Sequence, residues 1–231
     1  MTLAAAPTRA SSGRDPKRFT EPYAGVEAYY SAKVRKYGAT PRGVDWSCQA
    51  TQELRFIQLL KICDFSAPFT LNDLGCGYGA LCAFLERRHP QAGIDYLGID
   101  LSQTMVRRAR TRFASQSRRF TVGNTSRRLA DFSVASGIMN VNVGHSRESW
   151  EAFVADMLTE LRRISRSGFS VNFVAEKPEI SVAPGTATVE LYCTSPEPWA
   201  RYCERELGCT VETLDQYGMK EVTILARVTE R

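Results

Sequence analysis

The spacing of apolar and polar residues switches between a helical and an extended period along this chain. Apolar residues recur at helical spacing over residues 24–37, and Gly38 and Pro41 then end that pattern. A second helix is expected to begin near residues 47–51 and to end before Pro68. Two helices therefore precede the first apolar run that is typical of a strand.

Short apolar runs alternate with helical stretches from there to the C-terminus. The expected strands cover residues 69–74, 94–100, 120–122, 132–139, 169–175, 210–214 and 222–228. The expected helices cover residues 80–88, a stretch capped by Ser102, a stretch that starts at Ser146, and residues 199–207. Gly168 has the position of a left-handed C-cap. This alternation predicts a doubly wound α/β fold with a mainly parallel sheet.

The composition divides the chain into three parts. Residues 1–20 are rich in alanine, serine, arginine and proline, which is typical of a disordered tail. Residues 21–68 hold the N-terminal helices, and residues 69–231 form the expected core domain. Of all 231 residues, 43% are hydrophobic and 24% are charged, so the chain has enough apolar side chains for a packed core.

Three glycines at alternate positions, Gly75, Gly77 and Gly79, join the first core strand to its helix. Such a turn lets the backbone adopt positive φ and leaves space for a ligand. Asp73 stands at the end of the first strand, and Asp100 ends the second, where a carboxylate can accept both hydroxyl hydrogens of a ribose. Ligands of doubly wound sheets bind at this edge, so the pattern predicts a nucleoside-containing ligand.

The spacing of the glycines separates the candidate ligands. A dinucleotide site is expected to read GxGxxG and to hold a pyrophosphate, whereas this loop reads GxGxG. The carboxylate of Asp73 would repel a pyrophosphate but suits the ammonium group of a methionine moiety. No phosphate-binding GxxxxGK[ST] motif occurs anywhere in the chain. The pattern favours S-adenosylmethionine over NAD.

Residues 73–79 resemble motif I of the class I S-adenosylmethionine-dependent methyltransferases, and residues 98–102 resemble their motif II. The resemblance implies a seven-stranded sheet in the order 3-2-1-4-5-7-6, with the last strand antiparallel. It also implies S-adenosylhomocysteine as the product, a ribose held by Asp100, and a glycine loop under the methionine end. The expected cofactor-binding residues are Asp73, Gly75, Cys76, Gly77, Gly79, Asp100, Leu101, Asn124 and Thr125.

The chain departs from the common family pattern after the third and fourth strands. Asn124 stands where the family often has an acidic residue at the adenine amino group, and its amide oxygen can accept the same hydrogen bond. Residues 136–142 replace the [DN]PP[YF] tetrapeptide of amide and adenine N-methyltransferases. These two acceptor classes are therefore disfavoured.

Few residues are candidates for a role beside the transferred methyl group. Methyl transfer from a sulfonium depends mainly on alignment, and a base is needed only for a protonated nucleophile. His145, after the fourth strand, is the candidate base, although it can equally serve the start of the next helix. Asn140 and Asn142 are candidates for the substrate pocket, and Tyr192 lies in a long segment that is expected to shape it.

The N-terminal helices carry aromatic side chains, Tyr29 and Tyr30 among them, that are a second source of pocket residues. In the resembled family such helices often cover the cofactor, so these tyrosines either close the site as a lid or pack the helix on the sheet.

Several classes of protein are excluded by composition. No apolar run approaches the roughly 18 to 20 residues of a membrane span, and the N-terminus lacks a signal-peptide core, so we expect a cytoplasmic protein. Seven cysteines without paired CxxC spacing and only two histidines favour reduced, buried thiols and no metal site.

The net charge of +5 leaves the acceptor open. Eight arginines fall between positions 107 and 128, namely Arg107, Arg108, Arg110, Arg112, Arg118, Arg119, Arg127 and Arg128. They form either a solvated helix face or a docking patch for an acidic partner. Three hypotheses follow: a small-molecule methyltransferase, which we favour; an RNA or protein methyltransferase that uses this basic segment; and a cofactor-binding scaffold or partner subunit without catalysis. Oligomeric state is not predicted.

Overall fold

A seven-stranded sheet forms the centre of the protein, seen here in a computed structural model that describes residues 19–114, 119–176 and 191–229. Its strands have the order β3-β2-β1-β4-β5-β7-β6. β7 runs antiparallel to both of its neighbours, and the other adjacent pairs are parallel. The predicted fold class, strand order and antiparallel strand are confirmed.

The bounds of the elements differ from the predicted ones mainly at their ends. The strands are β1 (Phe69–Leu74), β2 (Ile94–Asp100), β3 (Arg119–Val122), β4 (Ala130–Ala135), β5 (Ser165–Val174), β6 (Cys209–Leu214) and β7 (Glu221–Val228). The helices are α1 (Thr20–Tyr37), α2 (Gln49–Leu59), α3 (Ala80–Arg88), α4 (Gln103–Arg112), α5 (Arg147–Arg163) and α6 (Glu197–Arg205), with short 3-10 helices η1 (Pro41–Val44) and η2 (Leu60–Ile62).

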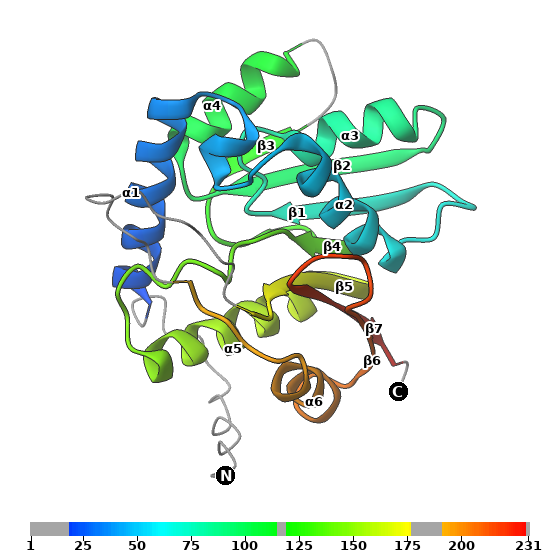
Figure 1. The fold of residues 1–231 in the computed structure, drawn as a ribbon. Coiled ribbons are helices and arrows are strands. Elements are labelled where there is room, and N and C mark those ends of the chain that lie inside the picture. Colours follow the sequence, from blue (N-terminus) through cyan, green and yellow to red (C-terminus); the bar gives the residue numbers. More distant parts are fainter. Residues whose placement is uncertain (1–18, 115–118, 177–190, 230–231) are drawn as a thin grey trace.

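Helices cover both faces of the sheet and bury two separate apolar clusters (Figure 1). α2, α3 and α4 pack over a cluster that includes Leu71 of β1, and α5 and α6 pack over a cluster that includes Leu74 of the same strand. Side chains three positions apart in a strand point to opposite faces, so β1 supplies both clusters. Figure 1 shows α1, in blue, standing beside the sheet rather than on either helix layer.

The predicted starts of two helices are confirmed, and one predicted C-cap is wrong. The hydroxyls of Ser102 and Ser146 accept hydrogen bonds from the amides of Met105 and Ser149, each at 3.2 Å. Gly168 is not a left-handed cap but lies inside β5. A Cβ atom there would lie 2.8 Å from the carbonyl oxygen of Ala226 on β7, so glycine is needed for close strand packing.

Two predicted boundaries are also corrected. Phe19 and Thr20, assigned to the tail, belong to the folded part, because Phe19 is 8% exposed and its ring lies 5.7 Å from that of Phe153. Residues 1–18 lie outside the described residues. β4 ends at Ala135 instead of residue 139, because the next residues turn at Gly137, where φ is +75°.

All seven cysteines are free thiols, and four of them are buried. Within the described residues, no helix combines the length and the apolar character needed to cross a bilayer.

Candidate active site

A cavity opens at the carboxyl ends of β1, β2, β3 and β4, with an empty volume of about 970 Å³ including the space at its mouth. Four connections that leave these strands form its floor. Its wall comes mainly from α1, α5 and residues 44–56, with Ala80 and Leu81 of α3 and Met105 of α4. The floor residues are Asp73, Leu74, Gly75, Cys76, Gly77, Tyr78, Asp100, Leu101, Ser102, Gly123, Asn124, Ser136, Gly137 and Ile138. Its mixed lining, mostly apolar with a few polar groups, is typical of a small-molecule site.

The glycine loop after β1 is fixed by backbone hydrogen bonds to β2. The amides of Gly75 and Cys76 both donate to the carbonyl oxygen of Ile99, at 2.7 and 3.0 Å. Gly77 has φ +54°, and a Cβ atom there would meet nothing closer than a Val44 methyl at 3.5 Å. The left-handed backbone, rather than crowding by the protein, therefore requires glycine at this position.

Asp100 ties the loop to the end of β2. Its Oδ2 accepts the amide of Gly77 and its Oδ1 accepts the amide of Ser102, both at 2.8 Å. Burial raises the pKa of Asp100 to about 6, the two amide donors oppose that shift, and the charge of Glu27 adds to it. Each carboxylate oxygen keeps a further lone pair for a ligand hydroxyl.

Asp73 is the second carboxylate of the floor and is only 2% exposed. The hydroxyl of Tyr96 donates to its Oδ2 at 2.5 Å. Burial raises the pKa of Asp73 to about 7, although the tyrosine hydrogen bond opposes the shift and the charge of Asp100 adds to it. A cationic ligand group would favour the ionised form of this carboxyl.

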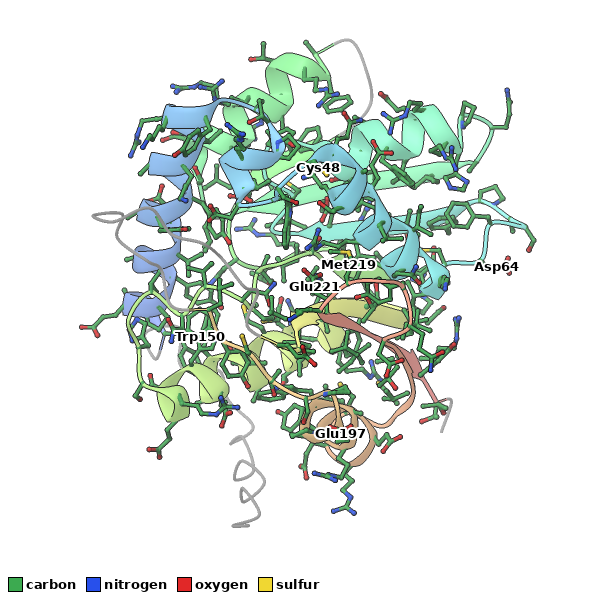
Figure 2. The ribbon with its side chains drawn as sticks, in the orientation of Figure 1. Cys48, Asp64, Trp150, Glu197, Met219 and Glu221 are labelled. Atoms are coloured by element: carbon green, nitrogen blue, oxygen red, sulfur yellow. The ribbon has the colours of Figure 1, made fainter. Side chains whose placement is uncertain are left out.

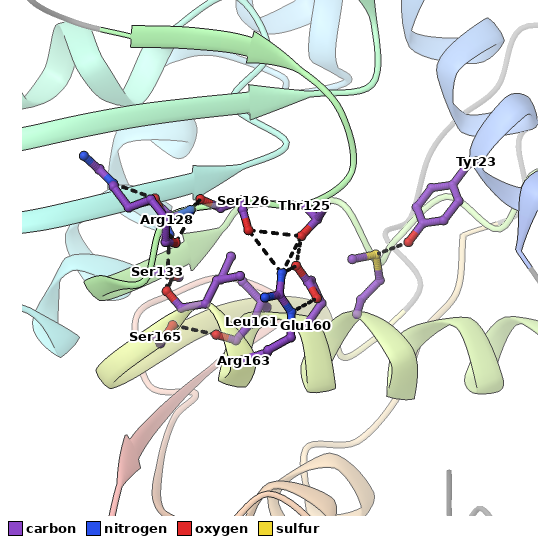
Figure 3. A network of polar contacts seen from close by, with 12 residues as sticks. Tyr23, Thr125, Ser126, Arg128, Ser133, Glu160, Leu161, Arg163 and Ser165 are labelled. Carbon is purple, nitrogen blue, oxygen red and sulfur yellow. Dashed lines mark hydrogen bonds and ion pairs between the residues drawn. The ribbon is translucent and has the colours of Figure 1, made fainter. Parts of the chain in front are cut away.

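The loop after β3 presents Asn124 to the cavity because its neighbours are bound to α5 (Figure 3). Thr125 donates to the carboxylate of Glu160, which is 2% exposed. Arg163 donates to the Thr125 hydroxyl at 2.9 Å and to the carbonyl oxygen of Ser126 at 3.1 Å. Thr125, predicted to bind the cofactor, is absent from the cavity lining and instead anchors the loop.

α1 forms a roof through Tyr23, Val26, Glu27 and Tyr30, which line the cavity. The hydroxyl of Ser31 lies 2.6 Å from that of Ser102, which joins the helix to the start of α4. Tyr30, a predicted pocket residue, thus lines the cavity. Tyr29 does not line the cavity, because its hydroxyl donates to Asp45 at 2.6 Å on the outer side.

A buried polar chain fastens the rest of the roof to the sheet. Arg55 of α2 lies over the ring of Trp46 at 3.7 Å and donates through Nε to Glu221 of β7 at 2.7 Å. Asn172 donates to the same carboxylate at 3.0 Å and accepts the amide of Gly137 at 2.8 Å. Glu221, labelled in Figure 2, therefore connects the roof to the loop after β4.

The Trp46 indole packs directly on that loop. A Cβ atom on Gly137 would lie 2.5 Å from Cζ2 of Trp46, so only glycine allows this approach. Both residues line the cavity.

The structure does not place His145 at the cavity. Its ring stacks on Trp150 with centroids 6.4 Å apart, and its carbonyl oxygen accepts a hydrogen bond from Asn142 at 3.3 Å. The preceding Val143 has φ +46°, an unusual value for a β-branched residue, and its side chain packs against Gly25 of α1. Asn142 itself holds this turn and does not line the cavity.

Three more predicted residues have packing roles. Asn140 accepts the amide of Val174 at 3.2 Å through its side chain. The hydroxyl of Tyr192, which is buried, contacts Glu151 and Trp199, each at 3.2 Å. Gly79 begins α3, and a Cβ atom there would lie 2.8 Å from the ring of Phe113. None of the three predicted residues lines the cavity.

The arginine segment divides into two groups. Arg110 donates twice to the carbonyl oxygen of Phe120, and Arg128 donates to the carbonyl oxygens of Leu71 and Asp95. These two side chains stabilise the fold. Arg107, Arg108, Arg112 and Arg127 are exposed, and the side chains of Arg118 and Arg119 lie outside the described residues.

The fold and this floor together define a class I methyltransferase. The donor set fits S-adenosylmethionine: carboxylates face the cavity at the ends of β1 and β2, and an amide follows β3. The hydroxyl of Ser136, also in the lining, is buried and has no hydrogen-bond partner among the described residues, which leaves it available to a ligand.

Comparisons with known proteins agree with this class. A family described as "Methyltransferase domain" matches residues 72–168. Rv1506c of Mycobacterium tuberculosis, to which methyltransferase activity is provisionally assigned, is 38% identical over 169 residues, which are 73% of this chain and 98% of that protein. The chain therefore belongs to the class I S-adenosylmethionine-dependent methyltransferases.

Solved structures share the fold at low sequence identity. Magnesium protoporphyrin IX methyltransferase from Synechocystis PCC 6803, with bound S-adenosylhomocysteine, has a TM-score of 0.61 and 15% identity, covering 88% of this chain and 98% of that one. Human N-acetylserotonin methyltransferase, in complex with S-adenosylmethionine, has a TM-score of 0.57 and 16% identity, covering 90% of this chain and 67% of that one.

Several cavity residues were missed by sequence reasoning. Glu27 had a usable signal, because Tyr23, Glu27 and Tyr30 fall on one face of a helix at spacings of four and three. Gln52 and Phe56, four positions apart in α2, also share one helix face. Phe153 and Met157, four positions apart in α5, also reach the cavity. No local pattern singles out Trp46.

Proposed function

We propose that this methyltransferase transfers the methyl group of S-adenosylmethionine to a small-molecule acceptor. The observation that carries the proposal is a single roofed cavity in which the glycine loop and Asp100 form one part and apolar side chains form the other. The apolar part includes Trp46, Phe56 and Ile138. A small planar or aliphatic molecule fits such walls.

Three floor residues would hold the donor. Asp100 would accept hydrogen bonds from the ribose hydroxyls, and Asp73 would face the methionine ammonium. The amide oxygen of Asn124 would accept a hydrogen bond from the adenine amino group. When bound, S-adenosylmethionine supplies an electrophilic methyl group on a positively charged sulfur, and S-adenosylhomocysteine is left with a neutral one. Leu101 and Val26 add apolar surface for the adenosyl part.

The chain's own contribution at the reacting end is orientation and exclusion of water. Trp46 is held by Arg55 and Gly137, so that wall of the acceptor part is rigid. Alignment of the two reactants can supply roughly 7 to 11 kcal/mol of the barrier. Among the described residues, the lining contains no histidine or lysine, which favours an acceptor that needs no strong base at neutral pH.

The roof supports a small acceptor over a macromolecule. α1 and residues 44–56 cover the cavity, so an RNA base or a protein side chain would have to reach beneath them. Arg110 and Arg128 bind backbone carbonyl oxygens of the protein itself, which leaves fewer arginines for an acidic partner.

The test combines donor binding with a search for products. Purified protein is titrated calorimetrically with S-adenosylmethionine and then incubated with the donor and panels of phenols, amines and thiols, or with RNA or protein. Mass spectrometry measures the methylated products. We expect a methylated small molecule that is lost in Asp100→Asn. Methyl transfer confined to RNA or protein contradicts the proposal, and donor binding without transfer to any panel supports the scaffold hypothesis.

A further inference from the structure

The charges around the cavity are of one sign. Its lining includes three carboxylates, Glu27, Asp73 and Asp100, and among the described residues it includes no lysine, arginine or histidine. Asp73 and Asp100 belong to the donor floor described above. Glu27 comes from a different element, α1, and has no counterpart in the glycine-loop pattern.

Glu27 is held at the cavity by its own helix. The hydroxyl of Ser31, one turn later, donates to its Oε1 at 2.6 Å and also contacts Ser102 at 2.6 Å. The carboxylate is thus linked to Ser102, the floor residue that caps α4. No described cation forms an ion pair with Glu27.

The charge of Glu27 acts on the floor of the site, because it adds to the upward shift of the pKa of Asp100. Because Glu27 and Asp100 line the same cavity, the charge of Glu27 also attracts a positive ligand there. The methyl donor carries one more positive charge than its spent product, because the sulfonium becomes a thioether.

We propose that Glu27 is a specificity-determining residue that makes the cavity bind the positively charged donor in preference to its neutral product. This inference rests on the proposed donor site and assigns a function to the roof. The expected preference is about tenfold, the order expected for one unit charge acting across a partly solvated cavity. Such a preference would limit inhibition by the product.

Three ligands of similar shape but different charge test whether Glu27 acts through its charge. Full-length protein is titrated calorimetrically with S-adenosylmethionine, S-adenosylhomocysteine and sinefungin, which carries a protonated amine near the position of the sulfonium. We expect Glu27→Gln to weaken both cationic ligands about tenfold and to leave S-adenosylhomocysteine within twofold. Glu27→Asp, which keeps the charge, should retain most of the preference.

Glu21→Gln is the matched control, because Glu21 lies on the same helix but is exposed and outside the cavity. It should change none of the three affinities, and thermal unfolding should show that all variants are folded. Equal weakening of all three ligands in Glu27→Gln would overturn the inference in favour of a ribose contact, and no weakening would overturn it as well. If the wild-type protein binds none of the ligands, the proposed donor site itself is wrong.

Discussion

The floor of the cavity and its roof are held by contacts of different range. On the floor, the amide of Gly77 donates to the carboxylate of Asp100, 23 positions away, and the amides of Gly75 and Cys76 donate to the backbone of Ile99 on the neighbouring strand. On the roof, Ser31 and Ser102 are 71 positions apart, and Arg55 and Glu221 are 166 positions apart. Side chains from distant parts of the chain hold the roof in place.

This difference separates two functions of the site. The floor depends on the sheet and on a short motif, so changes in the roof can leave it intact. The roof depends on a few buried polar contacts, so single substitutions there are expected to alter stability and acceptor fit together. The four predictions below test this separation, and they are ordered by expected size.

The largest effect is expected from breaking the buried pair. Glu221→Ala leaves Arg55 charged and unpaired in the interior, where both side chains are less than 8% exposed. We expect a loss of about 3 to 5 kcal/mol in the free energy of unfolding, measured by urea denaturation. Glu53→Ala, which removes a more exposed pair with Arg87, should cost less than about 1 kcal/mol. Equal losses in the two variants would contradict the distinction.

The second prediction concerns the floor alone. Asp100→Asn removes the negative charge that accepts the amides of Gly77 and Ser102 and is proposed to accept the ribose hydroxyls. We expect affinity for S-adenosylmethionine to fall about 100-fold, which corresponds to about 2.7 kcal/mol. Calorimetric titration measures the change. Asp64→Asn, at the exposed position labelled in Figure 2, is the control and should bind like the wild type.

The third prediction is a dependence on pH. The pKa values of about 7 for Asp73 and about 6 for Asp100 lie above those of an unfolded chain. Cationic ligands need these carboxyls ionised, so donor affinity should rise from pH 5.5 to 7.5 and then level off. Burial sets both shifts, while Tyr96, Glu27 and the two amide donors modify them.

Asp73 and Asp100 affect the stability of the free protein with the opposite dependence on pH. The folded, ligand-free protein binds more protons than the unfolded chain between about pH 4 and 7, so their contribution to the free energy of unfolding falls as pH rises through this window. Thermal unfolding of the free protein and calorimetry with the donor measure the two trends. A donor affinity that is highest at pH 5.5 would contradict the prediction.

The smallest effect is expected at His145. Because its ring stacks on Trp150 and does not line the cavity, His145→Ala should change donor affinity and turnover less than about twofold. A large loss of turnover with unchanged donor affinity would instead support the predicted role as a base. Measurement of both quantities on one preparation separates these outcomes.

The floor could be predicted because its residues are close together in the chain. The glycines from 75 to 79 and the acidic ends of two successive strands form a contiguous pattern whose chemistry is readable. His145 could not be placed in this way, because its direction depends on the turn at Val143 and on the hydrogen bonds of Asn142. Thr125 likewise depends on Glu160, 35 positions away.

The roof could be predicted only in part. Helical spacing indicates which face of α1 is apolar, and Tyr30 lies on that face at the cavity. The partners of Arg55 could not be inferred, since Trp46 precedes it in an irregular segment and Glu221 starts the last strand. A buried ion pair across the sheet requires the tertiary structure to be known.

The link between Arg55 and Glu221 also bears on the order in which the molecule matures during synthesis. Every residue of the floor has left the ribosome well before β7 is made, whereas Arg55 lacks its ion-pair partner until residue 221 emerges. A nascent chain that has folded through α5 would therefore hold the Arg55 guanidinium without its partner carboxylate. Completion of the last strand supplies the carboxylate that neutralises that charge and links α2 to the sheet.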